Sequence, residues 1–363
     1  RDLHLSIRRQ RQMCIRDRYK SPCLLRDFYH GQCLHGYYWI FMQSSHTLVA
    51  DQFNAVNTLI TEQLTSEVGL VENISHYLVD SGGKRVRPLV VLLSAAALGD
   101  AKHFKQIQLA TAIEFLHTAT LLHDDVVDMS TLRRGKPTAN ANWGNASSVL
   151  VGDFVYSKAF ELMVAIGSLP VMDVLSRSTT KIAEGEVKQL MLIGDLSLSQ
   201  ADYFDVIHNK TAVLFSGGCR CAAMIAETDS ETEHALALYG LHLGQAFQIF
   251  DDYLDYAGNA DDLGKNGGED LAEGKLTLPL IEALRLTTKT QDNRVLRRII
   301  EEKDLSGIET VVALCRESGA LDYTLTVAQS EANKAKQALA VLSQSNYRDA
   351  LSDIADKAVY RKQ

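Results

Sequence analysis

The sequence predicts an all-α protein, and three observations support this. Only 5 of the 363 residues are proline, so few positions interrupt a helix. Long runs rich in alanine, leucine and valine repeat their apolar residues at helical spacing. No alternation of apolar and polar residues is long enough to predict a sheet, and no internal repeat is found.

Composition limits the functions that are open to the chain. Hydrophobic residues make up 46% of it, which is enough to bury a sizeable core. The formal net charge of −8 argues against a protein that binds nucleic acid by neutralising its backbone. No apolar run reaches the roughly 18 residues of a membrane span. We therefore expect no transmembrane segment, while a peripheral membrane contact stays open.

Residues 1–45 differ in composition from the rest of the chain. Their formal charge is +5, which leaves −13 for the remainder. An aromatic patch, 37–41, follows the arginines, and no ordered signal-peptide regions are present. We predict that residues 1–45 are a non-native, artefactual or disordered leader and that residues 46–363 form one domain.

Three cysteines fall in the predicted domain, namely Cys219, Cys221 and Cys315. Their scattered positions do not make a disulfide framework, and a single Cys-x-Cys pair is a weak metal site. We expect them to be small buried side chains in a reducing compartment, which favours a cytoplasmic protein.

The first helices are expected from about Asp51 to Leu78, where apolar residues recur at helical spacing. The first strong break is 81–83, and Lys84 to Arg87 follow it. Pro88 is typical of the first position of a helix, so a helix is expected over 88–98. A basic turn before a helix N-terminus predicts an anion site, and a plain solvated turn is the alternative.

The next apolar helix ends in Asp124, Asp125 and Asp128, and Arg133 and Arg134 follow. Three carboxylates near a helix C-terminus oppose the helix dipole and repel one another. A cation should therefore relieve them. His117 lies seven residues before Asp124, on nearly the same face, and is either a core residue or part of that site.

Three further helices are expected over 147–163, 171–192 and 202–226. The last of them carries Lys210 and Thr211 among apolar neighbours. A lysine within an apolar helix either extends to solvent or meets an anion.

The helix expected over 235–256 has Gly240 and Gly244 on one face, which predicts close packing. Its end repeats the aspartate spacing of the earlier helix, with Asp251, Asp252 and Asp255. Two clusters with the same spacing on apolar helices are hard to explain without a shared ligand.

A glycine-rich loop follows over 261–275, with Lys265 and Lys275 in it. It is either a lid that closes over an anion or a surface connection. Amphipathic helices without evident chemistry are expected from Leu278 to the C-terminus.

Two carboxylate clusters with cations between them fit a hard divalent metal and a phosphate-containing substrate. The apolar helix surface that leads away from the aspartates indicates a pocket that is polar at its mouth and apolar below. Such a site suits a diphosphate attached to a hydrocarbon.

From about residue 47 to the C-terminus, the chain resembles the trans-polyprenyl diphosphate synthase family. The resemblance is carried by four motifs in the family's order: Gly82–Pro88, Asp124–Asp128 with Arg133-Arg134-Gly135, Lys210-Thr211, and Gln248–Asp255. It implies a single-domain antiparallel helical bundle of the isoprenoid synthase type around a central cavity, usually dimeric, so a homodimer is expected. One departure is Leu276, since proline often follows the lysine at that point.

The resemblance also implies the reaction, which is the Mg²⁺-dependent condensation of isopentenyl diphosphate with an allylic diphosphate, here farnesyl diphosphate. The implied metal ligands are Asp124, Asp125, Asp128, Asp251, Asp252 and Asp255. The allylic diphosphate would be held by Arg133, Lys210, Thr211, Gln248 and Lys265. Isopentenyl diphosphate would be held by Lys84, Arg87, His117 and Arg134. The implied catalytic residues are Asp124, Asp128, Arg133, Lys210, Asp251 and Lys265.

The residues beneath the first aspartates address product length. Leu116 and Thr120 form a stripe that runs down the helix from Asp124, and Ala119 is small. Since no bulky aromatic residue stands at 119 or 120, we predict a long product. Octaprenyl diphosphate for the ubiquinone side chain is implied by the resemblance.

Three alternatives stay open. A shorter-chain synthase shares the chemistry, and so does a terpene cyclase, which would not need the isopentenyl site at Lys84, Arg87 and His117. A silent regulatory subunit of a heteromeric synthase would tolerate the loss of one aspartate motif, whereas both are complete here.

Overall fold

The computed structural model describes residues 45–80, 83–100, 103–133, 135–257, 268–288 and 290–360, apart from the side chains of 79 and 80. These residues all lie in one compact unit, Ile40–Gln363. They are mostly helical, and the only strands among them are two strands of two residues each that form a hairpin. The all-α prediction is therefore confirmed. The predicted leader falls almost wholly outside the described residues, and its boundary at residue 45 stays a prediction.

After a short helical stretch at residues 45–48, the chain forms α3 (Ala50–Gln63), α4 (Gly69–Asp80), α5 (Val86–Ala97) and α6 (Phe104–Val127). The helix expected from Pro88 begins two residues earlier, because Arg85 in the left-handed region (φ 41°) turns the chain into α5. Pro88 still lies in the first turn, where a missing N–H costs no intrahelical hydrogen bond. The long helix α6 packs against α3, α5, α8 and α11 and so occupies a central position.

A short antiparallel hairpin follows α6, formed by β1 (Leu132–Arg133) and β2 (Lys136–Pro137). It is too short to leave an alternating pattern in the sequence. Three helices come next: α7 (Ala139–Trp143), α8 (Asn145–Ile166) and α9 (Leu169–Met191).

The helix expected over 202–226 is in fact three pieces: α10 (Gln200–Ile207), the π-helical turn η1 (His208–Ala212) and α11 (Val213–Ile225). Ser199 caps the N-terminus of α10, because its hydroxyl accepts a hydrogen bond from the Asp202 N–H. The π-helical turn carries Lys210 and Thr211. Such turns often occur at functional sites.

The longest helix, α12 (Ser230–Ala257), lies against η1 and α11. Its two glycines make this possible. A methyl group on Gly244 would lie 2.6 Å from the Ala212 Cα, and one on Gly240 would collide with the Phe215 carbonyl. The close packing predicted for this face is therefore present.

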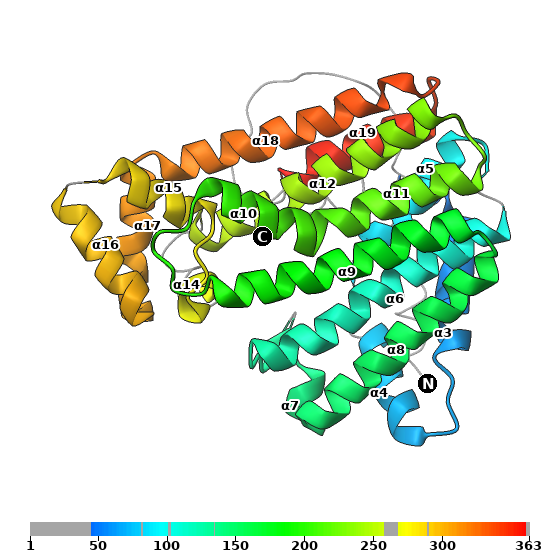
Figure 1. Cartoon of the computed structure of the whole chain (residues 1–363), viewed down its shortest axis with the longest axis horizontal. Coiled ribbons are helices and arrows are strands. Elements are labelled where there is room, and N and C mark those ends of the chain that lie inside the picture. Colours follow the sequence, from blue (N-terminus) through cyan, green and yellow to red (C-terminus); the bar gives the residue numbers. More distant parts are fainter. Residues whose placement is uncertain are drawn as a thin grey trace, which may run out of the picture. The chain divides into compact units, whose positions relative to one another are not determined.

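The remaining elements are α14 (Glu269–Glu273), α15 (Leu278–Leu286), α16 (Gln291–Glu302), η2 (Leu305–Gly307), α17 (Ile308–Glu317), α18 (Ala320–Ala338), η3 (Leu339–Val341) and α19 (Asn346–Ala358). α18 packs along α12. Figure 1 shows α6, α9, α11 and α12 side by side with their axes roughly aligned, as expected of a helical bundle.

Two further expectations can be compared with the described residues. Cys219, Cys221 and Cys315 are buried and free. Within the described ranges, no helix has the length and apolar character needed to cross a membrane.

Candidate active site

The first aspartate cluster lies at the C-terminal end of α6. Asp124 and Asp125 belong to its last turn, and Asp128 caps the helix by donating its N–H to the Asp124 carbonyl at 2.8 Å. The carboxylates are largely shielded from water, with 17%, 5% and 21% of the three side chains exposed in that order. The three acids therefore stand close together in a poorly solvated place.

Each of these carboxylates faces a different cation of the chain. Arg133 donates to the Asp125 Oδ1 from Nε at 2.9 Å and lies 2.7 Å from it through Nη2. Lys210 Nζ lies 4.0 Å from the Asp124 Oδ2, and Lys275 Nζ lies 3.0 Å from the Asp128 Oδ2. The repulsion expected from the sequence is thus relieved by the protein's own side chains.

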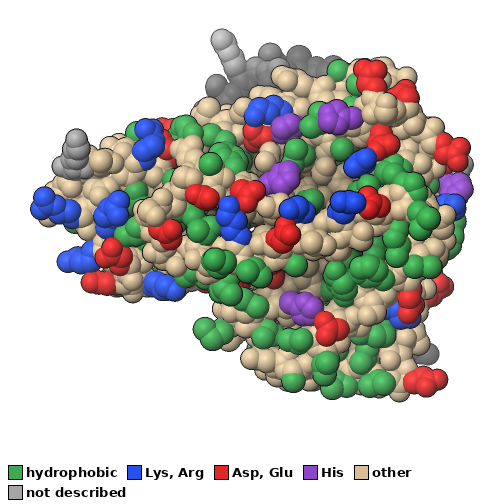
Figure 2. Space-filling view, viewed as in Figure 1, with side chains coloured by type: hydrophobic (Ala, Val, Ile, Leu, Met, Phe, Trp, Pro, Cys, Tyr) green, Lys and Arg blue, Asp and Glu red, His purple; other side chains and the backbone are tan. Residues whose placement is uncertain are grey.

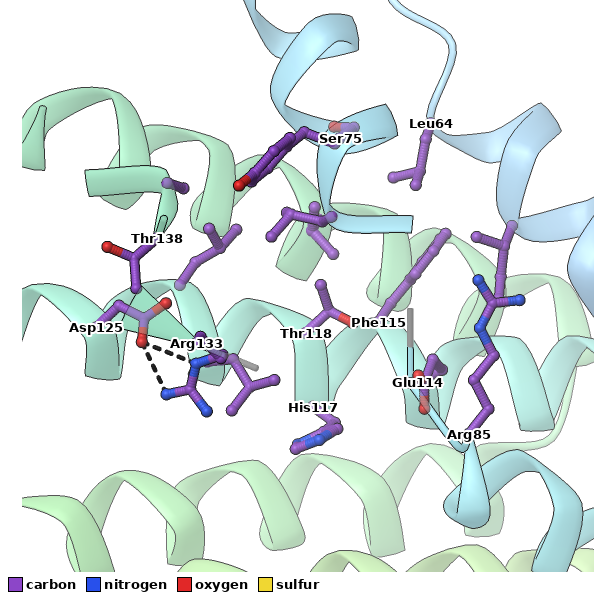
Figure 3. Close-up of a pocket in the computed structure, with 18 of the residues that line it drawn as sticks. Leu64, Ser75, Arg85, Glu114, Phe115, His117, Thr118, Asp125, Arg133 and Thr138 are labelled. Carbon is purple, nitrogen blue, oxygen red and sulfur yellow. Dashed lines mark hydrogen bonds and ion pairs between the residues drawn. The ribbon is translucent and has the colours of Figure 1, made fainter. Parts of the chain in front are cut away.

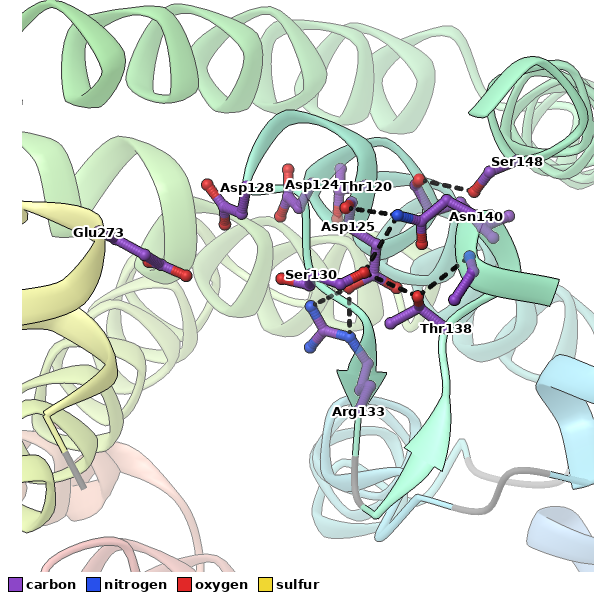
Figure 4. A network of polar contacts seen from close by, with 12 residues as sticks. Thr120, Asp124, Asp125, Asp128, Ser130, Arg133, Thr138, Asn140, Ser148 and Glu273 are labelled. Atoms are coloured by element: carbon purple, nitrogen blue, oxygen red, sulfur yellow. Dashed lines mark hydrogen bonds and ion pairs between the residues drawn. The ribbon is translucent and has the colours of Figure 1, made fainter. Parts of the chain in front are cut away.

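Residues after the hairpin hold the end of α6 in place (Figure 4). The Asn140 amide donates to the backbone carbonyls of Asp125 and Ser130, both at 3.0 Å. The Thr138 hydroxyl donates to the Ser130 carbonyl at 2.8 Å. Sequence reasoning missed Asn140 and Thr138, because nothing in their spacing indicates that they return to α6.

The second aspartate cluster lies at the end of α12 and makes internal hydrogen bonds. Asp252 is buried and accepts from the Tyr203 hydroxyl at 2.6 Å and from the Gln248 amide at 2.9 Å. The Thr211 hydroxyl donates to the Gln248 carbonyl oxygen at 2.9 Å. Two predicted diphosphate ligands, Thr211 and Gln248, are therefore bonded to each other and to an aspartate.

Asp255 caps the short helix α14. Its carboxylate accepts from the backbone N–H groups of Gly268, Glu269 and Asp270 at 2.9, 3.2 and 3.1 Å. These bonds join the end of α12 to the chain that leads to Lys275. Asp255 thus has a clear role in placing α14.

Burial shifts the protonation of the acids at this site. It raises the pKa of Asp124 to about 7, against the attraction of Lys210. Burial likewise raises the pKa of Asp252 to about 7, against the hydrogen bonds from Tyr203 and Gln248. The pKa of Asp270, which is near Asp252 and Asp255, lies well above its usual range because of burial. A divalent cation would offset this concentration of acids.

The aspartates of the two clusters are suited to a divalent cation, because carboxylate oxygens are among the ligands that Mg²⁺ prefers. Among the described side chains, however, no three of the types His, Cys, Asp and Glu are grouped closely enough to hold a metal by themselves. Any bound metal would complete its ligands with oxygens from water or from a substrate.

Three pockets lie at the site. The first and the third are lined by residues at the acidic end of α6, and the second by Asp252 of the other aspartate cluster. The first lies on the face of α6 toward α3 and α4 and is lined by His117, Arg133 and Asp125, together with Arg85 (Figure 3). The second is lined by Lys210, Thr211, Gln248, Asp252 and Lys275.

The third pocket is a groove between α6, α8 and α9, and it starts at Asp124. Its lining is mostly apolar: Leu116, Val127, Tyr156, Ile182, Ala183, Val187 and Leu190, with the polar residues Thr120, His123, Asp153, Thr179 and Glu186. Leu116 and Thr120, which were predicted to limit product length, therefore lie along a groove that leads away from the aspartates. Ala119 is fully buried and is not among the lining residues.

The other predicted substrate residues are placed as follows. Lys84 is exposed, and the Arg87 guanidinium lies 4.6 Å from the centre of the Phe215 ring. Neither lines the pocket that holds His117. Arg134 and Lys265 lie outside the described residues.

The chain is similar to known proteins over most of its length. A family model described as polyprenyl synthetase matches residues 68–317. Octaprenyl diphosphate synthase of Escherichia coli is 44% identical over 320 residues, which cover 88% of this chain and 99% of that protein. All-trans-nonaprenyl-diphosphate synthase (geranyl-diphosphate specific) of Rhodobacter capsulatus is 44% identical over 323 residues, which cover 89% of this chain and 99% of that protein.

A solved structure shares the fold. The polyprenyl synthase of Caulobacter crescentus, complexed with calcium and isoprenyl diphosphate, matches with a TM-score of 0.84 and 44% identity. The match covers 89% of this chain and 98% of that one.

Proposed function

The chain belongs to the polyprenyl synthetase family, and we propose that it condenses isopentenyl diphosphate with farnesyl diphosphate into a long all-trans polyprenyl diphosphate. Octaprenyl diphosphate is the product we propose, for the side chain of ubiquinone. The observation that carries the proposal is the apolar groove that begins at Asp124, in the first aspartate cluster. A diphosphate held at the acids would direct its hydrocarbon into that groove.

The proposed reaction begins with cleavage of the allylic C–O bond, and diphosphate leaves with the electron pair. The isopentenyl double bond then forms the new C–C bond, and a proton is lost to the released diphosphate. Mg²⁺, when bound, would stabilise the negative charge that grows on the leaving diphosphate. Asp124, Asp128 and Asp251 are the residues that we propose to hold it.

Within this reaction, the lysines of the second pocket have a defined task. Lys210 and Lys275 reach the first aspartates from different elements, so their charges lie beside the cluster at which we propose that the diphosphate binds. Thr211 and Gln248 line the same pocket and offer hydrogen bonds. Positive charge that is already in place where negative charge develops lowers the activation barrier, because no side chain has to move during the reaction.

We propose isopentenyl diphosphate binding on the side of His117. Because Arg133 lines the same pocket, we propose that it serves this substrate and not the allylic diphosphate that the resemblance implied for it. That pocket shares no lining residue with the groove, although His117 itself stands on nearly the same face of α6 as Asp124. The two substrates would then approach the end of α6 from two separate pockets. This arrangement supports a synthase over a cyclase, because a cyclase has no second substrate to bind.

A homodimer in the cytoplasm is also proposed. Hydrophobic side chains gather over α8 and α9 on the face that Figure 2 shows. The exposed ones are Val149, Leu150 and Val164 of α8 and Leu169, Val187, Leu190 and Met191 of α9. Apolar side chains gathered on one face often mark a protein interface, which supports the dimer.

The test of the function is incubation of the purified chain with farnesyl diphosphate, labelled isopentenyl diphosphate and Mg²⁺, followed by sizing of the products. We expect a C40 product and none without Mg²⁺. A C45 product would correct the length, in line with the nonaprenyl relative. A C15 or C20 end product would reject a long-chain synthase, and the absence of any condensation would reject the function altogether.

A further inference from the structure

Two glutamates outside both aspartate clusters hold the lysines of the site. Lys210 Nζ lies 2.7 Å from the Glu186 Oε2 but 4.0 Å from the Asp124 Oδ2. Lys275 Nζ lies 2.5 Å from the Glu273 Oε2 and 3.0 Å from the Asp128 Oδ2. Each lysine therefore lies nearer to a glutamate than to an aspartate of the first cluster. Figure 4 shows Glu273 of α14 facing the side of α6 that bears Asp128.

We propose that Glu186 and Glu273 are positioning residues that draw Lys210 and Lys275 away from Asp124 and Asp128, so that these aspartates can bind Mg²⁺. The inference rests on the proposed function, because it takes the first aspartate cluster as the metal site. A lysine bound tightly to an aspartate competes with a metal for the same oxygens. A glutamate that shares the lysine weakens this competition.

The local backbone brings Glu186 to Lys210. The residue before it is Gly185 of α9, where a methyl group would lie 2.8 Å from the Lys210 backbone nitrogen. Only glycine therefore lets α9 come this close to the π-helical turn that carries Lys210. The neighbouring glutamate then lies within an ion pair's distance of the lysine.

Glu273 reaches Lys275 by a different route. Gly274 separates them in the left-handed region (φ 76°) and ends α14. The Lys275 N–H donates to the Asp270 carbonyl at 2.8 Å, which closes the turn. Glu273 and Lys275, on either side of one glycine, therefore form an ion pair, and Lys275 also reaches Asp128.

The ion pairs are shielded enough for this competition to matter. The Lys210 and Lys275 side chains are only 24% and 13% exposed, and both glutamates are 29% exposed. Partly buried charges attract each other more strongly than surface pairs do, since water screens them less. The same two-acid arrangement occurs at both lysines although they belong to different elements, which a chance surface contact would not explain.

A double-mutant cycle separates this role from a direct one. If Glu186 acts through Lys210, Glu186→Gln should weaken Mg²⁺ binding about three- to ten-fold, as for groups coupled in one ion-pair network. In a Lys210→Met background the same substitution should have no effect. If Glu186 were a metal ligand, or acted only by its charge, it would weaken binding equally in both backgrounds.

The measurement is calorimetric titration of the full-length protein with MgCl₂, for the wild type, the two single variants and the double variant. The cycle is repeated with Glu273→Gln and Lys275→Met. Glu184→Gln is the matched control, because Glu184 lies on the same helix and pairs with the exposed Lys181. It should leave Mg²⁺ affinity unchanged.

Circular dichroism without metal shows whether each variant folds, and Glu186→Asp keeps the carboxylate if Glu186→Gln does not fold. This conservative variant should retain most of the wild-type affinity. Three results would each overturn the inference. Glu186→Gln could lower Mg²⁺ affinity equally in both backgrounds, it could leave Mg²⁺ affinity unchanged, or the wild type could fail to bind Mg²⁺. A protein that shows the expected cycle but makes no polyprenyl product keeps the inference and loses the proposed function.

Discussion

At the scale of single residues, the two faces of α6 have different neighbours. Thr120 lines the groove that starts at Asp124, and Thr118 lines the pocket of His117 and Arg133 on the other face. Two threonines that are two residues apart on one helix thus point to different pockets. They make a matched pair for testing which pocket receives the growing hydrocarbon.

We predict that Thr120→Phe shortens the product. One turn of helix rises about 5.4 Å, close to the length of one isoprene unit, so a ring at Thr120 would block the groove one turn below Asp124. Sizing of the products should show chains of C20 or less in place of C40.

Thr118→Phe is the control for this prediction, and its product should keep the full length even if turnover is slower. An unchanged length in Thr120→Phe, or shortening by Thr118→Phe alone, would place the hydrocarbon elsewhere.

Some residues of the candidate site can be predicted from the sequence because they stand in motifs, and others cannot because they are isolated polar residues. The aspartates, Lys210 and Gln248 stand in motifs whose spacing is visible in one dimension. Glu186, Glu273 and Asn140 are ordinary polar residues, and each acts through a partner more than ten residues away or across a turn. Only the folded chain brings them to the site.

At the scale of elements, the close packing of α12 against η1 connects the second aspartate cluster to Thr211. Gly244 is the contact point, since a methyl group there would lie 2.6 Å from the Ala212 Cα and 3.1 Å from the Phe215 ring. Gln248 lies one turn further along α12 and bonds to Thr211. The spacing of the two elements therefore sets a hydrogen bond at the site.

We predict that Gly244→Ala destabilises the protein by about 1–3 kcal/mol, the usual cost of overpacking a close contact. It should also lower turnover, because moving α12 away from η1 lengthens the bond between Thr211 and Gln248. Urea unfolding and the condensation assay measure the two effects.

Gly69→Ala is the matched control, because a methyl group there meets nothing within 4 Å. It should leave stability nearly unchanged and turnover intact. Equal effects of the two substitutions would mean that close packing at Gly244 is not the cause.

Helices were predictable because their apolar residues recur at regular spacing and glycines mark the breaks. The π-helical turn was not, since one extra residue per turn leaves the run around Lys210 apolar and continuous. The hairpin β1–β2 was missed for a similar reason, because two residues per strand are too few to alternate visibly.

At the scale of the whole molecule, the groove and the exposed apolar face share residues. Val187 and Leu190 line the groove, and they are also 58% and 56% exposed on α9. A second copy of the chain placed over α8 and α9 would cover the outer side of the groove. Dimer formation and product length are therefore expected to be linked.

We predict that the double variant Leu150→Asp and Val164→Asp is monomeric, whereas the wild type is a dimer. Both side chains are more than 60% exposed on α8, so charge there should oppose an apolar interface without disturbing the core. Light scattering after size-exclusion chromatography should give half the mass of the wild type. Leu305→Asp, which changes an exposed leucine in η2, should leave the dimer intact.

The same variant tests the link to product length. Without a partner over α9, the groove at Val187 and Leu190 would open to water, and each added isoprene unit would gain less from burial. At about 25 cal/mol per Å² of apolar surface, the loss grows with chain length, so later additions should suffer more than early ones. The monomer should therefore release shorter products while its first condensation proceeds at a near-normal rate. A monomer that still makes full-length product would show that the groove is closed within one chain.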